Sequence, residues 1–144
     1  MTELDEAPLD REAPPIEVRG LISRIGDRTI HDNLDLVVNR GDVVGVVGAS
    51  GTGKSVLLNT IIGLRNAEGG SVMIFGQDSR YARRPQWTAI NRRWGVLFQQ
   101  GALWSNLTVK ENVAAPLFEH TDMLKDEIDE LADLKIALAG LPPG

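Results

Sequence analysis

The stretch VVGVVGASGTGKS, residues Val43–Ser55, decides the fold of this 144-residue chain. Its first five residues, Val43–Val47, are apolar without alternation, which is typical of a strand buried on both faces. Residues 48–55 fit the pattern G-x-x-x-x-G-K-[ST], and the apolar run Ser55–Leu64 that follows predicts a buried helix. A buried strand, a glycine-rich loop and a helix in this order predict an α/β domain whose loop binds phosphate groups.

Each residue type in this loop has a physical task. Glycine lets the backbone curl so that successive N–H groups point at phosphate oxygens, and the following helix adds the partial positive charge of its N-terminus. Lys54 supplies a charge that can span two phosphates, and the hydroxyl of Ser55 is placed to bind Mg²⁺. The predicted nucleotide-binding residues are Gly48, Ala49, Ser50, Gly51, Thr52, Gly53, Lys54 and Ser55.

The segments around the loop predict further strands and helices. Four more strands are expected, at Ile16–Ile25 with a possible bulge at Gly20, at Leu34–Val38, at Ser71–Gly76 and at Trp94–Phe98. Residues 77–93 predict a loop with one short helix. Thr108 and Glu111 form a capping-box pattern, so a helix is expected from Val109 and is expected to bend or end near Pro116. A last helix within 122–139 is expected to place Leu124, Ile128, Leu131 and Leu138 on one face.

Length and charge limit the possible functions. The chain is long enough for one domain with an apolar core, expected over residues 16–144, after a flexible acidic leader at 1–15. A net charge of −5 argues against a nucleic-acid partner, and the absence of cysteine excludes disulfides and Cys-based metal sites. Five arginines lie within residues 80–93, and they fit a solvated loop better than a surface for a partner or for anionic headgroups.

Three segments carry a resemblance to a known family. Leu34–Ser55, Glu68–Gly76 (EGGSVMIFG) and Trp94–Pro116 (WGVLFQQGALWSNLTVKENVAAP) resemble the ATP-binding subunits of ABC transporters. Within that family, residues 93–123 are most similar to the ATPases of Mla-type transporters, which move phospholipid between membranes and are linked to organic-solvent resistance. The resemblance implies an α/β P-loop NTPase fold of the ABC type, with the N-terminal β subdomain, the Walker A core and the start of the helical subdomain.

The resemblance also implies cofactors, site residues and partners. It implies binding of ATP and Mg²⁺, with Gln99 as the Q-loop glutamine that ligates Mg²⁺ and acts with Lys54 in catalysis. Ile25 stands where the family usually has an aromatic ring under adenine; an ordinary core-strand residue is the equal alternative. The implied partners are an integral-membrane permease, a second copy of the subunit and, through the permease, a lipid-binding periplasmic component. The implied location is cytoplasmic, on the inner face of the inner membrane.

The sequence departs from the family in its hydrolytic motifs. No Walker B strand, LSGGQ-type signature or switch histidine is found, and His31 and His120 are expected at surface or turn positions. We therefore expect an N-terminal fragment that hydrolyses no ATP by itself. The alternatives are a non-catalytic P-loop domain that binds nucleotide weakly or not at all, and a soluble nucleotide kinase or GTPase.

Overall fold

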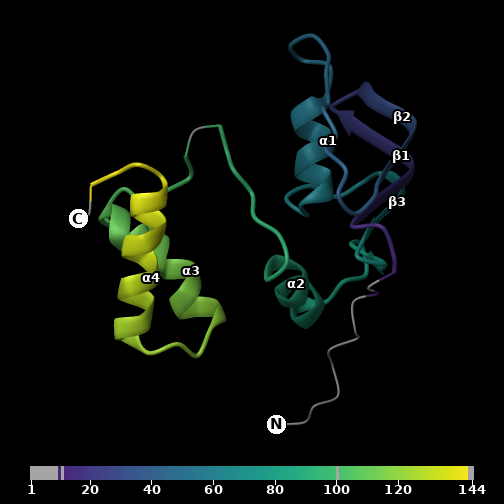
Figure 1. The fold of residues 1–144 in the computed structure, drawn as a ribbon. Coiled ribbons are helices and arrows are strands. Elements are labelled where there is room, and N and C mark those ends of the chain that lie inside the picture. The colour runs from purple at the N-terminus through teal and green to yellow at the C-terminus, as the bar shows by residue number, and fades with distance from the viewer. Residues whose placement is uncertain (1–9, 11, 100, 143–144) are drawn as a thin grey trace. The chain divides into compact units, whose positions relative to one another are not determined.

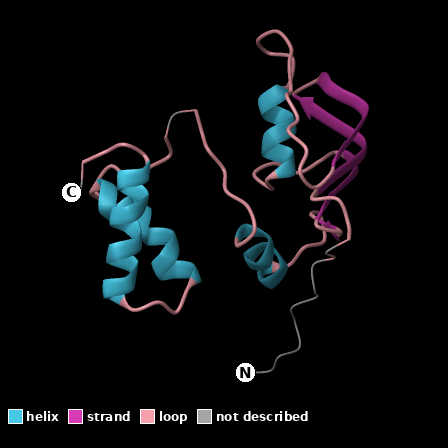
Figure 2. Cartoon of the chain, in the orientation of Figure 1, coloured by secondary structure: helices cyan, strands magenta, loops and turns pink. Residues whose placement is uncertain are grey.

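The computed structural model describes residues 10, 12–99 and 101–142, which belong to two compact units (Figure 1). The first unit ends at Trp94 and the second begins at Gly95. The first holds all the strands and the first two helices of the described chain, whereas the second holds a pair of helices, as Figure 2 shows. Each unit has an apolar core of its own.

The first unit is built on a four-stranded antiparallel sheet in the order β2-β1-β3-β4. Its strands are β1 (Ile16–Ile25), β2 (Arg28–Val38), β3 (Gly69–Ile74) and the two-residue β4 (Gln77–Asp78). The prediction for β1 is confirmed to the residue, and the second predicted strand is longer than expected because β2 begins directly after the turn at Gly26-Asp27.

The predicted bulge at Gly20 is also confirmed. The register between β1 and β2 shifts between Val18 and Leu21, and Gly20 has φ of +57°, a conformation that glycine adopts without strain. The N–H of Gly20 donates to the carboxylate of Asp35 at 2.6 Å, so this N–H has a partner outside the ladder. The bulge leaves Leu21 completely buried.

Helix α1 (Lys54–Ile61) packs its inner face against this sheet. Leu57 and Ile61 are buried, but Leu58 is half exposed, so the prediction of a helix buried all round is wrong. The sheet covers only one side of the helix, and Leu58 lies outside the apolar core of this unit. The apolar core of the unit consists of Val18, Leu21, Leu57, Ile61, Val72, Ile74, Phe75 and Ile90.

The predicted short helix in the basic segment is α2 (Arg84–Asn91). Pro85 lies in its first turn, where its missing N–H costs no hydrogen bond. Ile90 is completely buried, and Trp87 packs against the same core with its ring centroid 6.3 Å from that of Trp94. These apolar residues fix α2 to the first unit.

Two predicted strands are not formed. Val43–Val47 and Trp94–Phe98 are extended segments that pair with no strand in the described part of the chain. A strand needs a hydrogen-bonding neighbour, and the apolar pattern alone cannot supply one. As a result Val43 is fully exposed and Val47 is 92% exposed, although their residue types favour burial.

The second unit is a pair of packed helices, α3 (Val109–His120) and α4 (Lys125–Leu138). The predicted capping box is confirmed: Thr108 N–H donates to the Glu111 carboxylate at 2.7 Å, and Glu111 N–H donates to the Thr108 hydroxyl at 3.2 Å. The Thr108 backbone N–H is the main reason that the pKa of Glu111 lies below its usual value. Ala114, Ile128 and Ala132 form the core between the helices, and Lys110 pairs with Asp133 at 2.7 Å.

Two details of these helices differ from the predictions. Helix α3 continues through Pro116 to His120, because the contacts of Ala114 and Leu117 with α4 outweigh the hydrogen bond that proline cannot make. In α4 the buried positions are Ile128, Ala132 and Ile136, while Leu124 and Leu138 are each 72% exposed. No helix among the described residues is long and apolar enough to span a membrane.

Candidate phosphate-binding site

The glycine-rich loop between residue 48 and α1 has glycines in backbone conformations that favour glycine. Gly51 and Gly53 have φ of +78° and +103°, which side-chain-bearing residues rarely adopt. Gly53 is the N-cap of α1 and its carbonyl accepts from Leu57 N–H at 2.9 Å. A Cβ at Gly53 would collide with the side chains of Ile30 and His31, so only glycine fits at this helix start.

Lys54 lies over the loop with its ammonium group held by two backbone carbonyls. Its Nζ donates to the carbonyls of Gly48 and Ala49, both at 2.7 Å, and the hydroxyl of Thr52 also donates to Ala49 at 2.8 Å. An ammonium group has three donors. Two are used inside the loop, which leaves one for an anion at the helix N-terminus.

A cavity of about 300 Å³ opens beside the loop. It is lined by Ile25, Ile30, Ser50, Gly51, Gly53, Lys54, Ser55 and Val56. Ile25 is 53% exposed, so it is no core residue, and the structure brings it to the same cavity as the loop. No aromatic ring, carboxylate or imidazole is among the lining residues.

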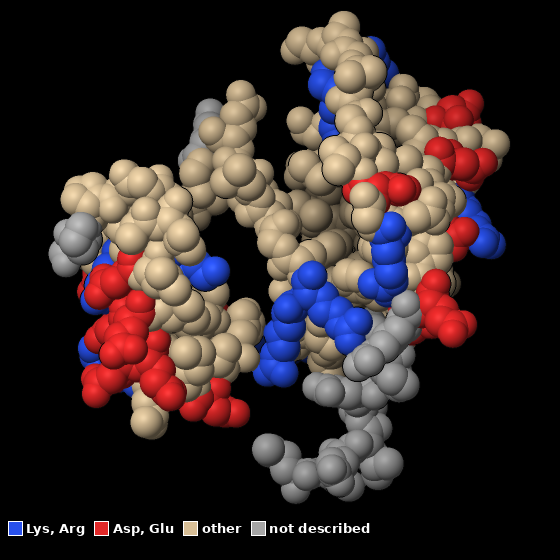
Figure 3. Space-filling view, viewed as in Figure 1, with Lys and Arg blue, Asp and Glu red and all other residues tan. Residues whose placement is uncertain are grey.

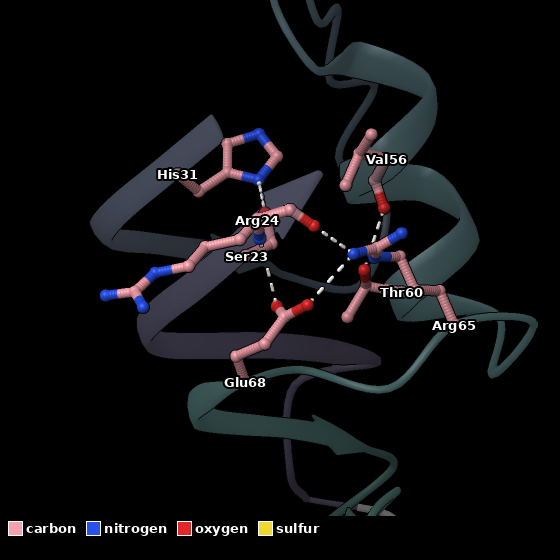
Figure 4. A network of polar contacts seen from close by, with 7 residues as sticks. All are labelled: Ser23, Arg24, His31, Val56, Thr60, Arg65 and Glu68. Atoms are coloured by element: carbon pink, nitrogen blue, oxygen red, sulfur yellow. Dashed lines mark hydrogen bonds and ion pairs between the residues drawn. The ribbon is translucent and has the colours of Figure 1, made fainter. Parts of the chain in front are cut away.

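A polar network holds the end of β1 beside α1 (Figure 4). The guanidinium of Arg65, after α1, donates to the carbonyl of Arg24 and to the carboxylate of Glu68, the latter at 2.9 Å. Glu68 in turn accepts from the N–H of Arg24 at 3.1 Å. Because Arg24 directly precedes Ile25, this network positions Ile25 at the cavity.

His31 lies under the loop, and the prediction of a surface or turn position is wrong. It is in β2 opposite Ser23 and only 8% of it is exposed. Its Nδ1 lies 2.5 Å from the hydroxyl of the fully buried Ser23, as Figure 4 shows, and its Nε2 lies next to Gly53. The polar residue is tolerated here because Ser23 satisfies one ring nitrogen. Burial lowers the pKa of His31, since desolvation penalises the charged ring.

This lowered pKa predicts a loss of stability as the pH falls. The unfolded chain takes up a proton at His31 near pH 6.5, whereas the folded chain resists protonation until a lower pH. The free energy of unfolding should therefore be constant above about pH 7.5 and decrease from about pH 6.5 downward. Thermal melting followed by circular dichroism between pH 5 and pH 8 measures the slope.

The matched variant is His31→Gln, which keeps a polar partner for Ser23 but cannot be protonated. Its melting temperature should vary less with pH in this range, where histidines are the side chains that ordinarily titrate. An identical slope for both proteins would contradict the assignment to His31.

Gln99, the predicted Q-loop residue, belongs to the second unit and is exposed. It lies in a turn closed by a 3.3 Å hydrogen bond from Gly101 N–H to the Phe98 carbonyl. The neighbouring Gln100, which is the alternative candidate for the Q-loop glutamine by its position, lies outside the described residues. The structure thus joins Ile25 with the glycine-rich loop in one cavity of the first unit, and Gln99 is not among the residues that line it.

The residues present fit a magnesium ion that is held mainly by phosphate. Among the described residues no group of three or more His, Cys, Asp or Glu side chains could hold a metal. Mg²⁺ usually keeps several waters and takes few protein ligands beside substrate phosphates. The exposed hydroxyl of Ser55, in the first turn of α1 and at the cavity, suits such a ligand.

Four residues that shape this site were missed by sequence reasoning. Ile30 and Val56 line the cavity, and Ser23 and His31 lie behind it. Ile30 has no partner in β1, because it lies at a register shift between the pairs Ser23–His31 and Arg24–Thr29, and no local pattern predicts that shift. The pairing of Ser23 with His31 depends on the register after the bulge, which no local pattern fixes.

The fold and the site together define a P-loop NTPase domain, in which a glycine-rich loop opens a helix packed on a sheet. A sequence profile described as "ABC transporter" matches residues 31–141. The chain therefore belongs to the ABC transporter family, and its fold is that of this family's nucleotide-binding domain. Because the chain belongs to this family, the alternative that it is a soluble nucleotide kinase or GTPase is wrong.

Similar proteins point to several transported substrates. The chain is 37% identical over 126 residues to the intermembrane phospholipid transport system ATP-binding protein MlaF of Haemophilus influenzae, covering 88% of this chain and 48% of that protein. It is 40% identical over 126 residues to the probable ribonucleotide transport ATP-binding protein mkl of Mycobacterium bovis, covering 88% of this chain and 35% of that protein. The chain thus spans less than half the length of these relatives.

A solved structure has the same fold. The dimeric ATP-binding cassette MJ0796, in a post-hydrolysis state bound to ADP and Pi, superposes with a TM-score of 0.77 at 28% identity. The match covers 88% of this chain and 58% of that chain.

Proposed function

We propose that this chain binds MgATP at Gly48–Ser55 as part of an ABC transporter's energy-coupling subunit. The observation that carries the proposal is the position of Lys54, whose ammonium is fixed over the loop at the N-terminus of α1 with one donor left for an anion. The helix N-terminus and the lysine attract the same negative charge. The cassette MJ0796, a relative in fold, is bound to ADP and Pi.

Each site residue has a proposed role. The backbone of residues 48–53 and Lys54 bind the phosphates, and the Ser55 hydroxyl ligates Mg²⁺, which neutralises charge on the phosphate oxygens. Ile25 contacts the base through an aliphatic surface, so base selectivity should be weak. Gln99 is proposed as a second metal ligand that also contacts the attacking water in the catalytic assembly with Lys54.

We propose that both units belong to one partial ABC-type domain at residues 16–144, preceded by an acidic leader at 1–15. Its partners would be an integral-membrane permease and a second copy of the subunit, at the cytoplasmic face of the inner membrane. The dimers of MJ0796 support the second copy. Phospholipid is the proposed substrate, and a lipid-binding periplasmic component that acts through the permease is a further proposed partner; the likeness to MlaF supports both. The name of the mkl relatives states a different substrate, ribonucleotides.

We further propose that the chain alone binds nucleotide without hydrolysing it. Gln99 could orient the attacking water but cannot deprotonate it, so hydrolysis also requires a carboxylate or an imidazole near the phosphates. The residues that line the cavity include no carboxylate and no imidazole, and His31 is buried behind Gly53. Phosphate capture and hydrolysis are therefore separate properties of this chain.

Displacement of a fluorescent ATP analogue from the 144-residue chain tests whether the chain binds MgATP, and phosphate release from the same samples tests whether it hydrolyses ATP. MgATP and MgADP should displace the analogue, GTP should compete within about tenfold of ATP, and AMP should be much weaker because the loop recognises the β- and γ-phosphates. The same samples should release no phosphate above the buffer rate. Displacement by AMP as effective as by ATP would refute recognition through phosphates, and phosphate release that depends on Lys54 would refute the lack of hydrolysis.

A further inference from the structure

Five arginines gather at the two ends of α2 in the first unit. Arg80, Arg83 and Arg84 lie before or at its start, and Arg92 and Arg93 follow its end. All five are exposed, and Figure 3 shows blue side chains gathered where Figure 1 places α2. We call these five residues the arginine patch. The helix has eight residues, so its ends are about 12 Å apart.

The patch has no compensating negative charge. None of its five guanidinium groups forms an ion pair with a carboxylate of the described residues. The nearest acid in sequence, Asp78, accepts from the backbone N–H of Arg80 and not from its side chain. The first turn of α2 contains no acidic residue, so the positive end of the helix meets positive side chains. Such an arrangement favours an anionic partner.

An aromatic ring accompanies the charges. Tyr81 is 73% exposed, and the guanidinium of Arg80 lies over its ring at 5.9 Å from the centroid. The core contacts of Ile90 and Trp87 hold α2, so the patch is presented from a fixed element. Exposed tyrosine beside arginine suits the headgroup level of a membrane, where the ring's apolar body and polar tip both find partners.

We propose that the arginine patch with Tyr81 is a docking surface for an anionic phospholipid membrane. The inference rests on the proposed function, which places the chain next to a membrane. Anionic lipids attract basic side chains near their surface, and the attraction fades within a Debye length. The net charge of −5 opposes nucleic acid and an anionic membrane alike, so the exposed ring of Tyr81 is the feature that favours the membrane.

Co-sedimentation of the 144-residue chain with lipid vesicles tests the proposal. The chain should bind vesicles that contain phosphatidylglycerol, bind pure phosphatidylcholine vesicles weakly, and dissociate as salt is raised. Each arginine should contribute about a fivefold change in partition, so Arg83→Gln with Arg84→Gln should lower binding about 25-fold. Equal binding to both kinds of vesicle would overturn the proposal.

A matched double variant separates the patch from net charge. Arg19→Gln with Arg28→Gln removes two exposed arginines of β1 and β2 and should change binding by less than about twofold, since neither belongs to the patch. Similar losses in both double variants would overturn the proposal, as would arginine-dependent binding to duplex DNA without binding to vesicles. Melting by circular dichroism confirms that both variants are folded.

Two further measurements distinguish a failure of the membrane-docking proposal from a failure of the proposed nucleotide binding. The Arg83→Gln and Arg84→Gln double variant should bind MgATP as the unmodified chain does, because neither residue lines the cavity beside the loop. Lys54→Ala should bind vesicles normally. Loss of vesicle binding in Lys54→Ala would overturn the proposal that the patch acts independently of the nucleotide site.

Discussion

Replacing Lys54 by alanine should lower the affinity of the chain for MgATP by about a hundredfold, because a hydrogen bond to a charged group contributes about 1.5–3 kcal/mol and the phosphates lose their nearest cation. In the structure the ammonium is held over the loop by the carbonyls of Gly48 and Ala49. A phosphate group bound at the N-terminus of α1 would contact the ammonium without a large movement of the side chain. Isothermal titration calorimetry with MgATP measures the change.

The fold must be shown to survive this substitution. Lys54 makes its two hydrogen bonds to an exposed loop and contributes nothing to the apolar core, so Lys54→Ala should melt within a few degrees of the unmodified chain. Lys135→Ala is the charge-matched control, since Lys135 is exposed in the last turn of α4 and forms no ion pair with a described residue. Equal affinities for Lys54→Ala and Lys135→Ala would rule out phosphate binding at this loop.

The parts of the fold that the sequence predicts well are those with short-range causes. Strand β1, the bulge at Gly20, the helix after Lys54 and the capping box at Thr108 all follow from neighbouring residues: alternation, a glycine in a strand, a glycine-rich loop and a reciprocal cap. The start of α1 directly after the glycine-rich loop has the same kind of cause, since the spacing of the loop places Lys54 at the first position of the helix.

The parts that were mispredicted depend on distant residues. Val43–Val47 has the composition of a buried strand, but a strand exists only when another lies beside it, and no described strand does. An isolated histidine such as His31 is expected at the surface or in a turn. The register after the bulge instead places it opposite Ser23 and under Gly53. The sequence left two equal roles open for Ile25, and the Arg65–Glu68 network, which holds the end of β1 beside α1, is the distant contact that places it at the cavity.

In the second unit, too, part of the fold depends on a contact that local propensity does not predict. This contact is made by the side chain of one residue, Asn112. Asn112 in α3 is 8% exposed and ties the preceding segment to the helix. Its Oδ1 accepts from the N–H of Trp104 at 2.8 Å. Its Nδ2 donates to the carbonyls of Trp104, Leu107 and Thr108 at 3.1, 3.2 and 2.9 Å. Among these groups the Trp104 and Thr108 carbonyls also accept from the backbone N–H groups of Leu107 and Asn112, so the groups that depend on the Asn112 side chain are the Trp104 N–H and the Leu107 carbonyl.

Asn112→Ala should therefore cost about 3 kcal/mol, because it leaves the Trp104 N–H and the Leu107 carbonyl without a partner at a partly buried site. Hydrogen exchange at the Trp104 amide, which donates to Asn112, should accelerate about a hundredfold. Asn112→Asp has nearly the same shape and keeps the acceptor for Trp104, but its carboxylate faces three carbonyl oxygens. Asn112→Asp should be at least as destabilising as Asn112→Ala at neutral pH. Because Asn112→Asp keeps the shape of the side chain, this result would assign the loss of stability to hydrogen bonds and not to packing.

Asn106→Ala provides the matched control, because Asn106 lies in the same segment and is exposed, so its removal should change stability by less than about 0.5 kcal/mol. Urea unfolding followed by circular dichroism compares the variants. If Asn112→Ala and Asn106→Ala unfolded alike, the four hydrogen bonds of Asn112 would carry no net stability. If instead only Asn112→Ala is weakened, the segment that connects Gln99 to α3 is held by this one side chain, and the proposed role of Gln99 depends on it.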